Sequence, residues 1–352
     1  MTPPLTRRRG WCPTLDEPMQ TGDGLLVRVK PPAATLTPAQ AHALAEAAAT
    51  HGNGIIELTQ RGNLQIRGLH PETVAPFATA IRTAGLALPP AQERRRPVMP
   101  PPLLGADPTI HPGAAALVAA LEHACNTDPR LKNLPGKFAI HVDAGGLLGN
   151  RPAAASLTAK PDGTLHPGDR SDAPTPAGPL PYDTTQMAYA LAPPFAQLDT
   201  PMLHALATIA TRHATTIRIT PWRALILATV STTANIAQEA GPAWITDPND
   251  PRLNIVACIG APGCTSATTQ TRTDALLLLP LPRHGITHIS GCPKGCAHPG
   301  PAPLTLVAID GHYQTIQNGR AQDATPKSPL PLGEGWVRVR PPAPPLTNKS
   351  AK

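Results

Sequence analysis

"PPAATLTPAQAHALAEAAATHGNGIIELT", residues 31–59, has a counterpart much later in the chain, "PPFAQLDTPMLHALATIATRHATTIRIT", residues 193–220. Both stretches contain an opening Pro-Pro pair, a His-Ala-Leu-Ala run and a later histidine, and the matching residues are 162 positions apart. A gap of one residue then aligns Leu58-Thr59 with Ile219-Thr220. A match in this order indicates an internal repeat, so each copy should fold as the same supersecondary unit.

The sequence pattern of each copy predicts one strand, one helix and two further strands. An apolar strand comes first, and a residue pair containing proline then supplies an N-cap and the first helical position. An Ala/Leu-rich helix follows, and the last segment alternates in polarity over a length that suits a strand, a tight turn and a second strand. The stretches are 24–29 and 187–192 for the first strand, Thr37-Pro38 and Thr200-Pro201 for the helix start, and 55–69 and 216–230 for the last two strands. The predicted class is therefore α+β, with a pseudo-twofold body and a cleft between its two halves.

A second block follows each copy of the repeat. After the first copy, residues 113–127 predict a helix, and residues 134–146 predict a strand that enters a glycine turn. After the second copy comes a cysteine-rich region, then a hairpin at 303–316 with Asp-Gly at its turn. The stretch 150–185 is rich in Pro, Ala, Gly and Asp, which predicts a linker or a long surface loop.

Composition limits the possible functions. The 352 residues exceed what one core usually holds, and 30 basic against 23 acidic residues give a formal net charge of +7. This charge suits either an anionic partner or simple surface solubility, and because aromatic residues are few, a nucleic-acid groove is not expected. The sequence has no apolar run long enough for a membrane span and no apolar segment behind its basic N-terminus. We therefore expect a cytoplasmic protein without a signal peptide, in which clustered cysteines indicate metal or redox chemistry.

Four of the six cysteines form two pairs, C-x5-C and C-x3-C, separated by 27 residues; they are Cys258, Cys264, Cys292 and Cys296. As buried small hydrophobic residues they would need core neighbours, but their flanks are Gly, Pro, Lys and Thr. Structural zinc favours tight pairs, which fits the second pair but not the first. A [4Fe–4S] cluster needs four thiolates on loops with small residues, and "IGAPG" and "PKG" are such loops. The spacing favours the cluster, and a zinc-stabilised binding module is the alternative from another functional class.

The cysteine pattern, with "GCPKGC" as its second half, resembles the sulfite/nitrite reductase family of siroheme and [4Fe–4S] proteins. "LTQRGNLQIRG" at 58–68 is similar to the family's tetrapyrrole-contacting strand, and "LPGKF" at 134–138 is similar to its lysine-bearing anion loop. The resemblance covers most of residues 10–325. It implies ferredoxin-like half-domains, each followed by a reductase-type α+β domain, and it makes the four cysteines the cluster ligands, with Cys296 facing the active site. The implied limits are 10–80 and 180–245 for the half-domains, 95–170 for the first α+β domain, 250–325 for the cluster-binding one, and 326–352 for a disordered tail.

Within this family the chain most resembles the precorrin-3B synthases. The similar stretches are "RRGWCPTLDEPMQTGDGLLVRV" at 8–29, "GNGIIELTQRGNLQIRGL" at 52–69, "HISGCPKGCAHP" at 288–299 and "NGRAQDA" at 318–324. The resemblance implies an O2-dependent monooxygenase that hydroxylates precorrin-3A at C20 and closes a γ-lactone in aerobic cobalamin biosynthesis. It also implies a mononuclear non-haem iron beside the [4Fe–4S] cluster. The chain has no dinucleotide fingerprint, so electrons that come ultimately from NADH would need a separate reductase or ferredoxin-like carrier.

A polar stripe is the main candidate for substrate binding. Arg61, Asn63, Gln65 and Arg67 alternate along one segment, so a regular strand would place all four on one face. Guanidinium groups pair with carboxylates, and a tetrapyrrole with acetate and propionate arms offers many. A solvated strand face is the alternative interpretation. Arg218 and Arg223 are weaker candidates in the second copy, where Trp222 takes the place of Arg61.

Lys137 matches the first lysine of the reductases' anion pair, while Ala139 replaces the second. This replacement favours the synthase over its close alternative, a siroheme-dependent sulfite or nitrite reductase.

Candidate ligands for a non-haem iron are histidines, because such a site needs His and carboxylate ligands with open positions for O2. His298, two residues after Cys296, is the first candidate for a catalytic role, and His141, His284 and His288 are further candidates. A lone histidine is more often a packing residue. Cys125 is expected in a helical core, and the role of Cys12 stays open.

Overall fold

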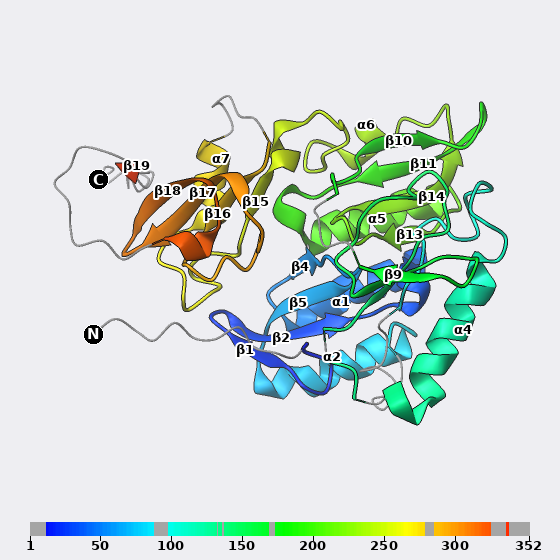
Figure 1. The fold of residues 1–352 in the computed structure, drawn as a ribbon, viewed down its shortest axis with the longest axis horizontal. Coiled ribbons are helices and arrows are strands. Elements are labelled where there is room, and N and C mark those ends of the chain that lie inside the picture. The colour runs from blue at the N-terminus through cyan, green and yellow to red at the C-terminus, as the bar shows by residue number, and fades with distance from the viewer. Residues whose placement is uncertain are drawn as a thin grey trace, which may run out of the picture. The chain divides into compact units, whose positions relative to one another are not determined.

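The structure, a computed structural model, describes residues 12–87, 98–131, 133–135, 137–168, 173–278, 285–324 and 336–337. It divides into two compact units, Met1–Leu253 and Asn254–Lys352 (Figure 1). None of the helices in the described ranges combines the length and hydropathy that a membrane span requires. The mixture of helices and mainly antiparallel sheets is the α+β class predicted from the repeat.

The first copy of the repeat forms a sheet with the strand order β1-β2-β5-β4-β12. Its strands are β1 (Met19–Thr21), β2 (Gly24–Val29), β4 (Ile55–Leu58), β5 (Leu64–Leu69) and β12 (Gln197–Asp199). The second copy forms a sheet in the order β10-β11-β14-β13-β3. Its strands are β10 (Gly178–Pro181), β11 (Gln186–Leu191), β13 (Ile217–Ile219), β14 (Leu225–Ser231) and β3 (Thr35–Leu36).

The two copies exchange an edge strand. β12 belongs to the second copy but pairs with β4, and β3 belongs to the first copy but pairs with β13. The backbone repeats as well, because Ala33 and Phe195 have φ values of 50° and 57°, and Gly62 and Arg223 both have φ of 62°. The repeat predicted from the sequence is therefore present in the backbone, with reciprocal pairing that the sequence did not indicate.

Two equivalent helices follow the exchanged strands, α1 (Pro38–His51) and α5 (Thr200–Arg212). α1 begins as predicted, because the Thr37 hydroxyl accepts from the N–H of Gln40 and Pro38 is the first helical residue. The prediction that Thr200 caps α5 is wrong by one residue. Asp199 accepts from the N–H of Met202 at 2.8 Å, since its carboxylate reaches the first turn and leaves Thr200 inside the helix.

One hydrophobic core joins α1, α5 and the inner faces of both sheets, with residues such as Leu44, Ile66, Leu206 and Leu225 fully buried. At its half-buried edge the equivalent histidines meet: the Nδ1 atoms of His42 and His204 are 2.8 Å apart. The remaining helices of this region are α2 (Pro71–Thr83), which lies beside α1, and α6 (Ile236–Ala240), beside α5.

The block after the first copy contains α4 (Ala114–Thr127) and a sheet in the order β6-β7-β8-β9. Its strands are β6 (Val98–Met99), β7 (Ile140–Val142), β8 (Leu157–Ala159) and β9 (Leu165–Pro167). The prediction of a linker or long loop at 150–185 is wrong for β8, β9 and β10. β9 and β10 are short strands at sheet edges, where proline is tolerated. Because both contain proline, their composition does not identify them as strands.

The second unit is built on one sheet in the order β15-β16-β17-β18-β19 (Figure 1). Its elements are β15 (Ile255–Ala257), α7 (Thr271–Leu277), β16 (Thr287–Ser290), β17 (Ala302–Ile309), β18 (His312–Gly319) and β19 (Trp336–Val337). The predicted hairpin is confirmed, with Asp310 and Gly311 at positive φ in its turn. Of the predicted disordered tail, only β19 belongs to the described residues.

Short 3₁₀ helices complete the described elements: Pro32–Ala34, Pro129–Leu131, Pro194–Ala196, Pro251–Asn254 and Ala321–Asp323.

Candidate functional site

Two neighbouring parallel strands bring the cysteine pairs to one edge of the second unit's sheet. β15 and β16 pair in parallel with Ala257 opposite Ile289, so the residues after both strands emerge side by side. Cys258 follows β15 directly, and its N–H donates to the carbonyl of Ile289 at 3.2 Å. The N–H of Gly291, just after β16, donates to the Cys258 sulfur at 3.2 Å. Cys292 is the next residue, so the strand pairing sets the positions of one cysteine from each pair.

The other two cysteines lie on the loops that continue from these strands. A turn in which the Cys264 N–H donates to the Gly260 carbonyl at 2.9 Å folds the first loop back. Burial raises the pKa of the Cys292 thiol, a backbone N–H of Lys294 opposes that shift, and the charges of Cys296, Cys264 and Cys258 raise the pKa further. The other three cysteines therefore each lie close enough to Cys292 for their charges to act on its thiol. Cys296 is exposed, while the other three are half-buried.

The chemistry of this donor set suits a [4Fe–4S] cluster, which takes four thiolate ligands. Among the described residues, no group of three or more His, Cys, Asp or Glu side chains is placed to hold a metal ion. The loops also offer N–H groups to the sulfurs, and a Cβ at Gly291 would lie 2.6 Å from the Cβ of Ala267. The four cysteines therefore suit a [4Fe–4S] cluster, and the ligand set stays a prediction.

The candidate histidines do not assemble one iron site within the described residues. His288 and His298 lie together in the second unit, with ring centroids 5.6 Å apart, and both are buried. His298 is also engaged with the carbonyl of Pro301 at 3.1 Å. His141 lies in the first unit, where burial lowers its pKa against the charge of Asp143, and its ring meets Trp222 edge-on. His284 lies outside the described residues.

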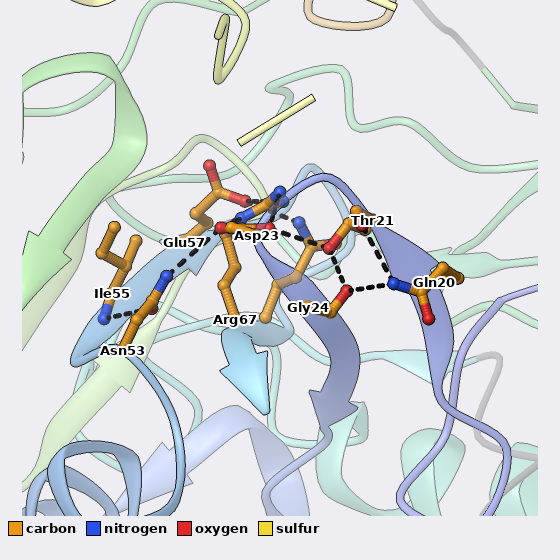
Figure 2. A network of polar contacts seen from close by, with 9 residues as sticks. Gln20, Thr21, Asp23, Gly24, Asn53, Ile55, Glu57 and Arg67 are labelled. Atoms are coloured by element: carbon orange, nitrogen blue, oxygen red, sulfur yellow. Dashed lines mark hydrogen bonds and ion pairs between the residues drawn. The ribbon is translucent and has the colours of Figure 1, made fainter. Parts of the chain in front are cut away.

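The outer face of the first copy's sheet carries a network of ion pairs (Figure 2). The Arg67 guanidinium donates to both oxygens of Asp23, at 2.8 and 2.9 Å, and to Glu57 at 3.3 Å. The amide of Gln65 donates to Glu57 at 2.6 Å and accepts from Arg28 at 3.2 Å. Arg67 and Glu57 are both buried. The network thus links three strands, β2, β4 and β5, and the turn that precedes β2.

The charges of Glu57 and Asp23 stabilise the Arg67 guanidinium in its buried position. Burial alone would lower the pKa of Arg67, but the charges and hydrogen bonds of Glu57 and Asp23 outweigh it and raise the pKa. For Asp23, burial acts to raise the pKa, and the hydrogen bonds and charge of Arg67 overcome it and hold the pKa below its usual value. Gln65 and Arg67 therefore pair with other side chains of the protein, and their predicted role in substrate binding stays a prediction.

The prediction that one regular strand carries the whole stripe is wrong for Arg61 and Asn63. β5 begins at Leu64, and Arg61 lies in the turn between β4 and β5, because the hydroxyl of Thr59 accepts from the N–H groups of Arg61 and Asn63 and folds the chain there. Arg61 and Asn63 nevertheless share a pocket that includes Lys30, Ala34 and Met99. The Arg61 guanidinium donates to the carbonyl of Lys137 at 3.0 Å.

Lys137 and Ala139 differ sharply in exposure. Lys137 is exposed on the loop that its carbonyl ties to Arg61. Ala139 is 1% exposed and packs with Met99, Ala153 and Ala155. A lysine at position 139 would have to bury its charge among these residues, so the missing second lysine is consistent with the local packing.

Arg218 and Arg223, the two candidate arginines of the second copy, lie in surroundings that differ from those of Arg61. Arg218 donates to the hydroxyl of Thr35 at 3.0 Å across the exchanged strand β3, and burial lowers its pKa. Arg223 lies in the β13–β14 turn at positive φ. Neither belongs to the pocket of Arg61. Their role in substrate binding stays a prediction.

Sequence reasoning missed several functional candidates on the first copy's sheet. Lys30 follows β2 directly, and its position before a Pro-Pro pair is the only signal that could have found it. Arg28 donates to Gln65 and also to the sulfur of Cys12 at 3.2 Å, which gives Cys12 a partner. Cys125 is confirmed as a core residue of α4, where burial and then Glu122 raise its pKa.

Comparisons with known proteins agree with this geometry. The family model of the nitrite/sulfite reductase ferredoxin-like half domain matches residues 17–84. The structure of the Mycobacterium tuberculosis NirA protein matches with a TM-score of 0.63 at 16% identity, over 90% of this chain and 77% of that chain, which shows a shared fold. A precorrin-3B synthase from Sinorhizobium sp is 32% identical over 390 aligned residues, which cover 89% of this chain and 84% of the relative. The chain therefore belongs to the precorrin-3B synthase family, within the wider group of proteins that resemble sulfite and nitrite reductases.

Proposed function

We propose that this chain is an oxidoreductase of the precorrin-3B synthase type, which hydroxylates precorrin-3A at C20 and closes a γ-lactone from the ring A acetate. The observation that carries the proposal is the 32% identity to a precorrin-3B synthase along 89% of the chain. In the reaction, one atom of O2 enters the substrate and the other leaves as water. The balance requires two electrons and two protons, which an external donor supplies.

The four cysteines, Cys258, Cys264, Cys292 and Cys296, would hold the [4Fe–4S] cluster. When bound, the cluster supplies one-electron transfer between that donor and the active site. The greater exposure of Cys296 leaves its sulfur the most accessible of the four, in keeping with a position toward the active site.

The substrate's acid groups would be received by the pocket around Arg61. Lys30 and Arg61 bring two positive charges to the lining of this pocket against the one carboxylate of Glu122, and Asn63 adds an amide that can donate to a carboxylate. The hydrogen bond from Arg61 to the Lys137 carbonyl restrains the guanidinium, so less side-chain freedom is lost on binding. The role of these residues is to hold and orient the macrocycle by its arms.

A siroheme-dependent sulfite or nitrite reductase is the second candidate, because the half-domain family model is named for those enzymes. Buried Ala139 in place of a second anion-binding lysine argues against it. A zinc-stabilised binding module is the third candidate, and its prediction is zinc without acid-labile sulfide.

The first experiment is an absorption spectrum of anaerobically purified protein, with iron, zinc and acid-labile sulfide assayed on the same sample. A broad visible shoulder with iron and sulfide supports the synthase, sharp tetrapyrrole bands indicate siroheme, and zinc alone indicates the binding module. Precorrin-3A is then supplied with an electron donor and isotopically labelled O2. A product that has gained one labelled oxygen atom supports the proposal, and an unchanged substrate with a fully loaded cluster would overturn it.

The ligand set is tested by a matched pair of variants. Cys296→Ser should lose iron and sulfide, because it removes one thiolate of the predicted set, while Cys125→Ser should keep both, because Cys125 lies in the core of α4. Equal cluster content in the two proteins would remove Cys296 from the set.

A further inference from the structure

The pocket around Arg61 has one acidic residue in its lining, Glu122 of α4. The other charged lining residues are Lys30 and Arg61, so two cations and one carboxylate give the lining a formal charge of +1. A carboxylate at this place repels any anion that enters the pocket. Glu122 therefore acts against the two cations that attract the acid groups of a ligand.

The packing of α4 against β6 brings Glu122 to the pocket. Val98 of β6 lines the pocket, and it also shares a core cluster with Cys125, which follows Glu122 by three residues on α4. Burial and then the charge of Glu122 raise the pKa of Cys125, so the carboxylate lies close to that thiol. The half-buried Glu122 side chain is thus held where α4 meets β6, beside the pocket.

The charge of Glu122 is not neutralised by a neighbouring side chain. Among the residues that the structure describes, Glu122 forms no hydrogen bond or ion pair through its carboxylate. The carboxylates of Asp23 and Glu57 differ in this respect, because both pair with Arg67. A half-buried charge is screened less by salt than an exposed one, so the charge of Glu122 acts on an anion in the pocket.

The net charge of the lining decides which anions the pocket prefers. The attraction of an anion to a positive pocket grows in proportion to the charge of the anion, whereas the cost of removing its hydration grows with the square of that charge. A weakly positive pocket therefore favours a monoanion, and a strongly positive one favours a dianion. A single acetate or propionate arm would bring the formal charge of this lining from +1 to zero.

We infer that Glu122 is a specificity-determining residue, which weakens the positive potential of the Arg61 pocket so that a monoanionic carboxylate arm is preferred to a dianion. The inference rests on the proposed function, because the arm belongs to the tetrapyrrole. It lets the pocket keep two cations for the macrocycle and still disfavour small inorganic dianions.

The test measures the affinities of sulfate and propionate for the full chain, purified anaerobically. Each affinity comes from the rise of the unfolding temperature with anion concentration at constant ionic strength. Glu122→Gln keeps the size of the side chain and removes its charge. Because Coulomb energy is proportional to charge, propionate should bind about 5-fold and sulfate about 25-fold more tightly, and the ratio of sulfate to propionate affinity should rise about 5-fold.

Two further variants control for charge and place. Glu46→Gln removes the same charge from an exposed position of α1 outside the pocket, so the ratio should stay at the wild-type value. Arg61→Gln removes a positive charge from the pocket itself, so both anions should bind less tightly and the ratio should fall. An unchanged ratio in Arg61→Gln would mean that the anions bind elsewhere, and this result would overturn the inference.

Three other results would also overturn the inference: an unchanged ratio in Glu122→Gln, an equal rise in Glu46→Gln, or no binding of either anion to wild type and Glu122→Gln. The proposed function is judged separately, because the anion measurements need no tetrapyrrole. If wild type does not oxygenate precorrin-3A but Glu122→Gln changes the ratio as expected, only the proposed function fails. If wild type oxygenates precorrin-3A and Glu122→Gln leaves the ratio unchanged, only the inference fails.

Discussion

The two copies of the repeat share a backbone but differ on the outer faces of their sheets. The strand registers match position by position, since Arg28 pairs with Gln65 in the first copy as Ala190 pairs with Ile226 in the second. The equivalent pairs of residues are Arg28 and Ala190, Glu57 and Arg218, Gln65 and Ile226, and Arg67 and Ala228. The first copy thus has a polar network where the second has mostly apolar side chains.

The second copy's outer face is a hydrophobic core. Ala190 and Ile226 pack there with Leu103, Leu148 and Trp222, so the block after the first copy covers this sheet. The inner faces of both sheets, in contrast, contribute alike to one shared core. The repeat thus keeps the residues that pack against the helices and varies the opposite face, which is polar in the first copy and covered by apolar residues in the second.

The turns between the last two strands show a smaller difference of the same kind. The side chain of Arg61 donates to the carbonyl of Lys137, and that of its counterpart Trp222 donates to the carbonyl of Pro152 at 2.7 Å. Both turns therefore attach to the same block of the chain. The residue that makes this contact is a cation, Arg61, in the first copy and an indole, Trp222, in the second.

Exchanging the residues at equivalent positions should have the largest effect. Ala190→Arg would bury an unpaired charge among apolar residues and should lower the free energy of unfolding by about 5 kcal/mol or more. The reciprocal Arg28→Ala removes the hydrogen bonds to Gln65 and Cys12 from a half-buried site and should cost about 1 kcal/mol. Chemical denaturation of both variants measures the difference. Equal costs would mean that the two outer faces are not distinct environments.

Breaking the network from inside should have the next largest effect. Arg67→Met leaves the carboxylates of Asp23 and Glu57 without their buried cation and should cost about 3–5 kcal/mol. Adding Asp23→Asn and Glu57→Gln removes those charges, so the triple variant should be more stable than Arg67→Met alone. A triple variant that is less stable would show that packing of the Arg67 side chain, rather than its charge, holds this face together.

The turn residues should separate ligand binding from stability. Arg61→Gln should weaken binding of precorrin-3A about 10- to 100-fold, because a hydrogen bond to a charged group contributes about 1.5–3 kcal/mol. Its free energy of unfolding should change by less than about 1 kcal/mol, since the side chain is half-exposed. An anaerobic absorption titration measures the affinity. Arg223→Gln tests the weaker candidate of the second copy and should have a smaller effect, and an equal loss in both variants would extend the binding site to that copy.

Acid should weaken the first copy's network gradually. The pKa of Asp23 is lowered in the folded protein, so below about pH 4, the usual range of an unfolded aspartate, the unfolded state binds more protons. The stability that Asp23 contributes is present above this range and is lost as the pH falls through the folded pKa. The difference in unfolding free energy between wild type and Asp23→Asn should therefore be largest near neutral pH and shrink in acid. A difference that does not vary with pH would contradict the shift.

Local patterns in the sequence were enough to predict the repeat and its strands and helices, because each of these depends on neighbouring residues. The four-cysteine cluster site stays a prediction, although the parallel pairing of β15 and β16 brings the start of each cysteine loop to one edge of the sheet. The exchange of β3 and β12 depends on pairing between segments more than 100 residues apart, which periodicity does not encode. The pairing of Gln65 and Arg67 with carboxylates could not be predicted from the sequence, because the partner carboxylates lie on another strand and in a distant turn. Arg61 was predicted to lie on a strand, but it lies in a turn. This turn depends on hydrogen bonds to the Thr59 hydroxyl, and the sequence pattern signals such a turn only weakly.

The contact between His42 and His204 has a consequence for the symmetry of the chain. In an isologous dimer a residue on the twofold axis touches its own copy, and these two histidines, which match in the repeat, do the same within one polypeptide. Their ring centroids are 5.1 Å apart with the Nδ1 atoms 2.8 Å apart, so the two nitrogens point at each other. An N–H···N bond needs one donor and one acceptor, so the two matching histidines have different roles in this contact. The first unit is thus organised like a dimer within a single chain, and its two halves differ at their own axis because only one of the two rings can donate.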